Sequence, residues 1–499
     1  MRRAVGLFPY AVGLLGLGGL VTGACSSEGP YGPPRTVIQA EIRGVDSFEW
    51  NGFSLGLAGD VNGDGRADLQ VSALAAGQGG RIGVFFGPVE GVLESAGADL
   101  LLTGELPFSN AGQSLTEAGG CDFDRDGTSD LLIGAPFADR TDVQMSAAAS
   151  GDNSGRAYLI YGKTGPGGDL SVGKADHVFF GERRYDAAGS HVACLGDLDG
   201  DGFDDIAITA PRSASAESKG AGAVYLFYGR ERGGLPASLG LESADAILRG
   251  EGAHDGAGTF VGKAGDHDGD GHPDFVIGAP GSDLGGPDSG ALYVWLGGSS
   301  RLHGTLSLAQ AAHVLFGRAG QRLGMTASRA GDVDGDGRED LLIGGSPVGS
   351  AAEAPGEAYL ISGRHRHGRF AASSVGVTLI GGTAGDGTGI AVATLGDVTG
   401  DRRADLLVGS PRAADAGAVY LLTGRELTFP SRIVLSEPEV HTVLRGQSPG
   451  DALGETVRAV GDLDGDGVSE LGVSARAHAT AQAAGGVVYI LSGKALGGR

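Results

Sequence analysis

The chain is poor in the features that usually carry catalysis or nucleic-acid binding. Of its 499 residues only three are cysteine and 6% are aromatic, and 37 basic side chains face 61 acidic ones, for a formal charge of -24. This acidic balance argues against nucleic acid and against an anionic membrane surface as partners. Neither a His-Glu-x-x-His nor a Walker motif is present. We therefore expect a binding protein rather than an enzyme.

One apolar run is long, and it lies at the N-terminus. Arg2 and Arg3 precede the apolar residues 4–21, and Thr22-Gly23-Ala24-Cys25 follows them. A charged start, an apolar stretch and small residues mark an export signal, so we assign residues 1–24 to a signal peptide. The last four residues resemble a bacterial lipoprotein cleavage box, although Thr22 stands where leucine is usual. This predicts lipidation of Cys25, with residues 25–35 as a tether; ordinary secretion is the alternative.

The expected location follows from this segment. No other apolar run is long enough to span a bilayer, so a membrane attachment would depend on the lipid at Cys25 alone. We expect an outer-membrane or cell-surface lipoprotein, and otherwise a secreted or periplasmic protein.

Glycine and one acidic pattern are abundant instead. The chain has 96 glycines and seven copies of a loop close to Asp-x-Asp-x-Asp-Gly-x-x-Asp, which begin at Asp60, Asp122, Asp197, Asp266, Asp332, Asp397 and Asp462. A period of about 67 residues indicates a repeat architecture. Positions 1, 3, 5 and 9 of the loops hold 26 of the 61 acidic side chains, which explains much of the negative charge.

The loop pattern predicts a calcium site. In the fifth copy Asp332, Asp334, Asp336 and Asp340 occupy positions 1, 3, 5 and 9, and position 7 can offer its backbone carbonyl. Ligands that are all oxygen, in a turning glycine-rich loop, suit calcium better than zinc or magnesium. We predict up to seven ions, held by Asp60, Asn62, Asp64, Arg66, Asp68; Asp122, Asp124, Asp126, Thr128, Asp130; Asp197, Asp199, Asp201, Phe203, Asp205; Asp266, Asp268, Asp270, His272, Asp274; Asp332, Asp334, Asp336, Arg338, Asp340; Asp397, Thr399, Asp401, Arg403, Asp405; and Asp462, Asp464, Asp466, Val468, Glu470.

These loops are not EF-hands. An EF-hand needs a bidentate glutamate at position 12, whereas position 12 here is always valine or isoleucine: Val71, Ile133, Ile208, Ile277, Ile343, Val408 and Val473. An apolar run such as residues 341–343 predicts that each loop leads into a buried strand.

The seven loops are not equivalent. Asn62 replaces aspartate in the first copy, and Glu470 replaces it in the seventh. The sixth copy departs most, because Thr399 occupies position 3 and Arg402 stands where the other loops have glycine. We expect the sixth site to be the weakest.

The two remaining cysteines precede neighbouring loops. Cys121 lies one residue before the second loop and Cys194 lies three residues before the third, on equivalent strands of adjacent repeats. A disulfide is one interpretation in an oxidising compartment. The interpretation that we favour from the sequence is two small buried thiols.

Each repeat contains four short strand-like runs, which in the fifth copy are residues 323–331, 341–343, 357–362 and 377–380. Such a unit cannot bury both of its faces alone, so the chain is predicted to be an all-β, seven-bladed β-propeller of four-stranded blades. The blades span about 54–104, 112–181, 189–250, 258–317, 324–381, 389–446 and 454–494. The last has only three runs, and residues 36–43 are expected to complete it and to close the ring.

These repeats resemble FG-GAP repeats, the units of the propeller at the N-terminus of integrin α subunits. The Gly-Ala-Pro element stands at residues 134–136 and 278–280, with variants at 209–211, 345–347 and 409–411. We place the Phe-Gly element, with leucine or valine in place of phenylalanine, at Leu55-Gly56, Val261-Gly262, Leu323-Gly324 and Leu453-Gly454. The resemblance covers residues 36–494. It implies structural calcium in the loops and ligand binding on the face opposite to them, although fold alone does not fix function.

The function expected from the sequence is surface recognition or adhesion, with a protein or a polysaccharide as the ligand and a monomeric chain. The turns after the second and fourth strands form the candidate face, where Arg140, Arg183, Arg184 and Tyr185 are candidate contacts and Trp50, Phe53 and Phe108 are candidate exposed aromatics. A lectin or carbohydrate-active enzyme on that face and a structural envelope component are the alternatives.

Overall fold

The computed structural model describes residues 33–497, apart from 47–48, 117–118, 140–151, 164–166, 215–218, 348–353, 364–366, 425–431, 438–441 and 480–484. The predicted signal peptide, Cys25, most of the tether and Arg140 therefore lie outside the described residues.

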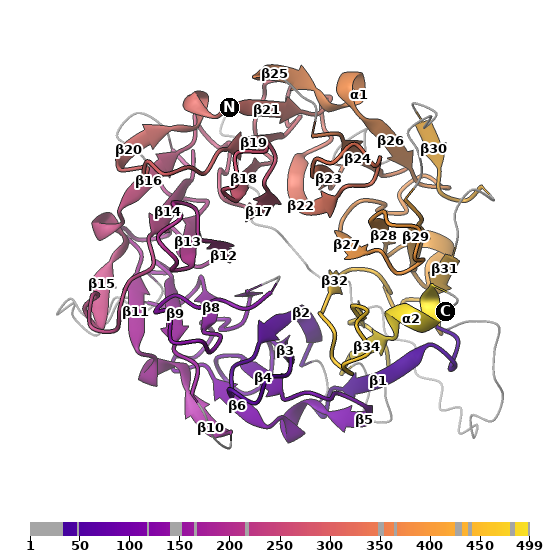
Figure 1. The fold of residues 1–499 in the computed structure, drawn as a ribbon, viewed down its shortest axis with the longest axis horizontal. Coiled ribbons are helices and arrows are strands. Elements are labelled where there is room, and N and C mark those ends of the chain that lie inside the picture. Colours follow the sequence, from indigo (N-terminus) through magenta and orange to yellow (C-terminus); the bar gives the residue numbers. More distant parts are fainter. Residues whose placement is uncertain are drawn as a thin grey trace, which may run out of the picture.

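Seven β-sheets surround a central axis as the blades of a propeller (Figure 1). The innermost strands are β2 (Asn51–Gly59), β7 (Ser114–Leu115), β12 (Val192–Gly196), β17 (Phe260–Gly265), β22 (Leu323–Gly331), β27 (Val392–Gly396) and β32 (Val457–Ala459). The second strands are β3 (Asp68–Ala73), β8 (Leu131–Ala135), β13 (Asp205–Ala210), β18 (Asp274–Ala279), β23 (Asp340–Gly345), β28 (Asp405–Ser410) and β33 (Leu471–Ala475). The seven-bladed all-β prediction is confirmed.

The outer half of each blade follows the same plan. The third strands are β4 (Arg81–Phe85), β9 (Arg156–Ile160), β14 (Ala223–Phe227), β19 (Ala291–Trp295), β24 (Glu357–Ile361), β29 (Ala418–Leu422) and β34 (Val487–Leu491). The fourth strands are β6 (Leu100–Thr103), β11 (His177–Phe180), β16 (Ala246–Arg249), β21 (His313–Phe316), β26 (Val377–Ile380), β31 (Thr442–Arg445) and β1 (Ile38–Arg43).

The core lies between the blades. Seven clusters of buried side chains each join two neighbouring sheets, for example blades two and three through Leu159 and Tyr225. Side chains alternate along a strand, so on β9 Tyr158 faces blade one while Leu159 faces blade three. Because both faces are covered, second strands such as β23 are buried at every residue and consist largely of Val, Ile, Leu, Gly and Ala.

The structure adds a fifth strand to six of the seven sheets, which we did not predict. It comes from the following blade and pairs in parallel with the fourth strand; for example β5 pairs with β1. These strands are β5 (Gly91–Glu94), β10 (Gly168–Ser171), β15 (Ser238–Gly240), β20 (Gly304–Ser307), β25 (Gly368–Ala371) and β30 (Arg432–Val434). Short helical segments complete the described elements: η1 (Ser95–Gly97), η2 (Val172–Lys174), η3 (Leu241–Ser243), η4 (Leu308–Gln310), α1 (Ala372–Val375), η6 (Ala413–Asp415) and α2 (Gly493–Leu496).

Ring closure occurs where it was predicted. Strand β1 pairs antiparallel with β34, so the first described strand completes the last blade. Ala40 and Ile42 of β1 are fully buried against Leu55 and Val488 of the neighbouring strands. The first and last described strands therefore lie in one sheet.

The Gly-Ala-Pro element packs against a glycine of the next blade. A Cβ on Gly134 would lie 2.0 Å from the carbonyl oxygen of Gly189, which begins the next blade with φ +79°. Gly278 and Gly324 repeat this contact. Both positions need glycine, because the two backbones approach more closely than a side chain allows.

This contact corrects the predicted Phe-Gly positions. Gly324 and Gly454 make this contact with Gly278 and Gly409, and their φ angles are +84° and +92°. Leu55-Gly56 and Val261-Gly262 instead lie inside β2 and β17. In those blades the equivalent glycines are Gly52 and Gly258, so the predicted positions were wrong there by four residues.

Substituting Gly134 with alanine is expected to lower the free energy of unfolding by roughly 2 kcal/mol, because the new methyl group meets backbone that cannot move cheaply. Gly97→Ala is the matched control, since nothing lies within 4 Å of its added Cβ. Denaturant unfolding measures both variants. Equal stabilities for the two would contradict the close contact.

Candidate calcium loops and the opposite face

Each acidic loop joins the first two strands of a blade and is organised by its first aspartate. In the fifth loop the Asp332 carboxylate accepts backbone N–H groups from Gly335, Asp336 and Gly337 at 2.6, 3.0 and 2.9 Å. Gly335 and Gly337 have φ of +76° and +85°, which lets the backbone curl around that carboxylate. The same contacts from positions 5 and 6 recur in the other six loops.

The carboxylate at position 9 ties the loop to the rest of its blade. Asp340 accepts the N–H of Val333 at 3.0 Å and that of Gly363, in the turn after β24, at 2.9 Å. It is buried, and burial raises its pKa to about 7. Burial, together with a smaller effect of the neighbouring loop aspartates, raises the pKa of Asp130 and Asp205 to about 8.

The predicted ligands converge. In the second, third and fourth loops, oxygens from positions 1, 3 and 9 lie within 4.8 Å of one another, and in the fifth loop those of positions 1, 3 and 5 do. Closely spaced carboxylates that are partly withdrawn from water repel one another, and a bound divalent cation would remove that cost. The donor set is entirely oxygen, as a hard cation such as calcium requires.

The seventh loop gives an independent test of this fit. Glu470 is fully buried, and its Oε2 accepts the N–H of Leu463 at 2.6 Å. Its Oε1 has no hydrogen-bond partner among the described residues. A buried carboxylate oxygen without a donor is costly, so this oxygen fits a cation ligand.

The sixth loop keeps the two departures seen in its sequence, and its weaker affinity stays a prediction. Thr399 Oγ1 is buried without a hydrogen-bond partner among the described residues, and Arg402 adopts a left-handed conformation with φ +69°. Arg125 of the second loop is strained in the same way, with φ +59°. A left-handed backbone conformation costs arginine more free energy than glycine, because the arginine Cβ crowds the backbone.

The residues at position 7 form the same backbone hydrogen bond in their loops, but their side chains make different contacts. Their N–H groups donate to the position 5 carboxylate, as Arg338 does to Asp336 at 2.9 Å. The side chain of Arg403 reaches towards Gly335 of the preceding loop, and His272 lies against Gly200. Neighbouring loops are therefore in contact around this face of the ring.

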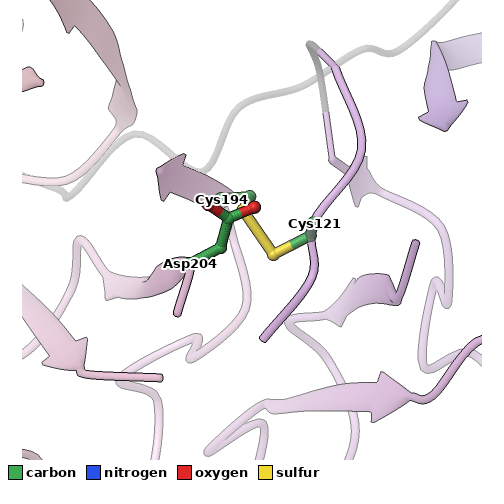
Figure 2. Close-up of side chains that lie close together, drawn as sticks. All are labelled: Cys121, Cys194 and Asp204. Carbon is green, nitrogen blue, oxygen red and sulfur yellow. A yellow bond between two sulfur atoms is a disulfide. The ribbon is translucent and has the colours of Figure 1, made fainter. Parts of the chain in front are cut away.

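A disulfide joins Cys121 and Cys194, so the interpretation that we favoured was wrong. Cys194 lies in β12 and Cys121 lies in the segment between β7 and β8 of the adjacent blade, with the two Cα atoms 5.7 Å apart. Figure 2 shows the bond with Asp204 beside it; the Asp204 carboxylate accepts the N–H of Asp122 at 3.0 Å. The bond links blades two and three directly before their loops. Disulfides are typical of exported proteins.

Exposed aromatic side chains gather on the opposite face. Trp50, Phe108 and Tyr185 are 42%, 83% and 53% exposed and lie in the turns that lead into blades one, two and three. All three have left-handed backbones, with φ of +58°, +60° and +67°. In blade four His254, with φ +69°, takes the position of Phe108 and Tyr185, four residues before the turn glycine, whereas Trp50 lies two residues before Gly52. Aromatic residues are thus held exposed at positions that favour glycine.

Arginines accompany these rings. Arg184 lies over Tyr185 at 5.3 Å, and Arg476 lies over both Trp50 and Phe53, at 5.8 and 5.2 Å. Phe53 itself is half-buried rather than exposed. Arg183 is exposed and donates to the Ala214 carbonyl, in the turn after β13, at 2.8 Å.

A second set of buried acids was missed from the sequence. Asp186, Asp255, Asp386 and Asp451 each accept a backbone N–H from three residues earlier in the turn that enters a blade. Burial raises the pKa of Asp186 to about 6. The signal was available as Asp-x-x-Gly, which ends at Gly189, Gly258, Gly389 and Gly454. These carboxylates shape the turns that carry the exposed residues.

A small pocket of about 150 Å³ opens among the starts of the inner strands on the same face. Its lining includes Phe53, Phe260, His191, Thr326 and Glu455. The Glu455 carboxylate accepts a hydrogen bond from Arg476 at 2.5 Å.

Comparison with known proteins identifies relatives. A model of the FG-GAP repeat matches residues 116–160, 191–227 and 388–422, and a model of an FG-GAP-like repeat matches residues 266–343. Phosphatidylinositol-glycan-specific phospholipase D of Bos taurus is 27% identical over 411 residues, which cover 78% of this chain and 46% of the relative. Integrin alpha-5 of Xenopus laevis is 36% identical over 187 residues, covering 36% of this chain and 16% of the relative. The chain therefore spans less than half the length of either relative. No helix among the described residues is long and apolar enough to cross a bilayer.

Proposed function

Since the chain is an FG-GAP repeat protein related to the N-terminal propeller of integrin α subunits and to phosphatidylinositol-glycan-specific phospholipase D, we propose that it is a calcium-stabilised recognition module of the cell exterior. In this proposal calcium is structural. The residues at positions 1, 3, 5 and 9 hold it, and the position 7 carbonyl completes the site. The bound ion supplies positive charge to a buried set of carboxylates.

The observation that carries the recognition role is the row of Trp50, Phe108 and Tyr185. An exposed aromatic ring and a left-handed backbone each cost free energy, and the turns that enter blades one, two and three carry both, at one position for Phe108 and Tyr185 and two residues later for Trp50. Tryptophan, tyrosine and arginine are the residues most enriched at the energetic centres of protein interfaces. We therefore favour a protein ligand on this face.

Replacing the three aromatic residues with glycine separates recognition from folding. Trp50→Gly, Phe108→Gly and Tyr185→Gly together are expected to lower affinity for a captured ligand at least tenfold while leaving the melting temperature unchanged or higher, because glycine suits a positive φ. Val92→Ala is the control, since Val92 is 61% exposed on β5, away from this face.

The measurement is binding of the protein to an array of extracellular proteins and polysaccharides, with calcium and then with a chelator. Loss of a calcium-dependent signal in the triple variant alone supports the proposal. Equal binding by the triple variant and Val92→Ala would remove this face from recognition. Binding confined to polysaccharides would favour a lectin.

The lectin and carbohydrate-active alternatives would use the small axial pocket, where Phe53 and Phe260 lie near Glu455. The Glu455 carboxylate is already engaged in an ion pair with Arg476. Residues 446–450 have the Gly-x-Ser-x-Gly spacing of a hydrolase elbow, but they join β31 to β32 rather than a strand to a helix. These observations favour binding over catalysis. A structural envelope role would instead require a fixed partner that co-purifies.

We further propose that lipidation of Cys25 holds the exported protein at a membrane. β1 begins at Ile38, so the anchor and the ring would be joined by the short segment at residues 25–35.

A further inference from the structure

Two of the acidic loops have a guanidinium group among their carboxylates. Arg232, in the connection between β14 and β15, contacts Asp124 and Asp126 of the second loop. Arg301, in the connection between β19 and β20, contacts Asp199 and Asp201 of the third loop in the same way. In both cases the arginine comes from the following blade and reaches positions 3 and 5.

Both arginines are held in place. Arg232 lies over the ring of Tyr161, and Arg301 lies over the ring of Tyr228, each at 4.8 Å from the ring centroid. The two tyrosines directly follow the third strands of blades two and three. An aromatic face and two carboxylates together fix the planar guanidinium more firmly than one exposed ion pair would.

The arginine takes the carboxylate oxygens that a cation would need. In the second loop, Oδ1 of Asp126 accepts the N–H of Thr128 at 2.9 Å and Oδ1 of Asp124 lies 3.3 Å from the N–H of Asp126. The Oδ2 atoms of both residues contact Arg232. Calcium can use positions 3 and 5 fully only if the guanidinium moves away.

The seventh loop provides the contrast. The connection of the following blade that faces it, residues 86–90, reads Phe-Gly-Pro-Val-Glu and contains no basic residue. The ion pair at this loop is longer, with Lys494 Nζ 3.7 Å from Asp466. Glu470 Oε1 has no hydrogen-bond partner among the described residues. This loop therefore has a weaker positive partner than the second and third loops, and a bound ion would supply more of its positive charge.

We propose that Arg232 and Arg301 set the calcium affinity of the second and third loops by competing with the ion. The inference rests on the proposed role of the loops as calcium sites. Without calcium each arginine neutralises part of its loop and keeps it ordered. With calcium each must be displaced, so these two loops fill later than the seventh. The Cys121–Cys194 disulfide joins the same two blades, so blades two and three have both a covalent bond and ion pairs that do not require calcium.

The test is site-resolved. Crystals of the protein and of Arg232→Gln are grown at limiting calcium, and anomalous scattering gives the occupancy of each loop. We expect the seventh loop to fill before the second and third. Arg232→Gln is expected to tighten the second loop about five- to tenfold, since two partly exposed ion pairs no longer compete. The third loop, with Arg301 intact, is the internal control. In Arg301→Gln the third loop should bind calcium more tightly and the second loop should be unchanged.

A second readout distinguishes competition from a merely structural role. In a chelator Arg232→Gln should lower the melting temperature, because the second loop loses its own cation. In saturating calcium it should not. Lower occupancy of the second loop in Arg232→Gln would overturn the inference, because the arginine would then be helping calcium to bind. Simultaneous filling of the second, third and seventh loops in the unmodified protein would also overturn it. Failure of every loop to take up calcium would instead refute the proposed function.

Discussion

Removing calcium at pH 8 is expected to lower the melting temperature by about 15 °C, the largest effect of any solution change. A site kept at 100 times its dissociation constant adds about 2.7 kcal/mol, and several such sites act on one ring. The carboxylates that lose their ion include the buried position 9 side chains of all seven loops. Differential scanning calorimetry in calcium and in a chelator measures the change.

The pH dependence should change sign with calcium. Burial raises the folded-state pKa of Asp68 and Asp274 to about 6, of Asp340 and Glu470 to about 7, and of Asp130 and Asp205 to about 8. These values lie above those of an unfolded chain, so without calcium the protein loses stability as pH rises from 5 to 8. With calcium it should lose stability as pH falls through the same range, because protons displace the ion.

Magnesium is the control for the calcium effect. It is smaller and demands a tighter octahedral geometry, so it should restore little of the lost stability. A melting temperature that is the same in calcium and in the chelator would contradict the structural role of the ion. Parallel pH profiles under the two conditions would contradict the competition with protons.

Deleting residues 36–44 should destabilise the whole ring rather than one blade. The deletion removes β1, exposes the edges of β34 and β5, and uncovers the cluster that contains Ile42 and Val488. Ile42→Ala alone is expected to cost about 3 kcal/mol, because Ile42 is fully buried. The deletion should lower the free energy of unfolding by more than Ile42→Ala does, and it should broaden the unfolding transition.

A peptide of residues 36–44 tests this closure directly. Added to the deleted protein, it should raise the melting temperature with a saturable dependence on peptide concentration. The same peptide with Ile42→Asp is the control and should have no effect, because a charge cannot enter the cluster. An unchanged melting temperature after the deletion would show that β1 does not fasten the ring.

The repeat period made most of the fold predictable. Seven loops in register define the blades, and apolar runs such as residues 341–343 mark the second strands. Strand β1 was predictable because the last repeat has no fourth run of its own. These features are local, or they repeat at a fixed spacing.

The features that were missed depend on contacts between blades. Strand β5 has the sequence Gly-Val-Leu-Glu and is mostly exposed, so it has no strand pattern of its own and forms because β1 offers an edge. The disulfide depends on how closely β12 approaches the segment that follows β7 in the neighbouring blade, which the spacing of the cysteines alone does not give. Arg232 and Arg301 lie in connections that differ in length, so nothing in the sequence aligned them with the loops of the preceding blades.

The candidate face was predictable as a surface but not in its details. The turns after the second and fourth strands do form it, and Tyr185 is exposed there. Its backbone conformation, which it shares with Trp50 and Phe108, is visible only in the structure. Arg183, also predicted as a contact residue, is exposed and forms a hydrogen bond that joins its turn to the turn after β13, which the sequence did not reveal.

A crystal structure of the protein in saturating calcium tests the central claim most directly. The account predicts an ion in each loop, 2.3–2.6 Å from the carboxylates at positions 1, 3, 5 and 9 and from the position 7 carbonyl, with the sixth loop filling last. Loops that remain empty at saturating calcium, with the ring intact, would contradict it.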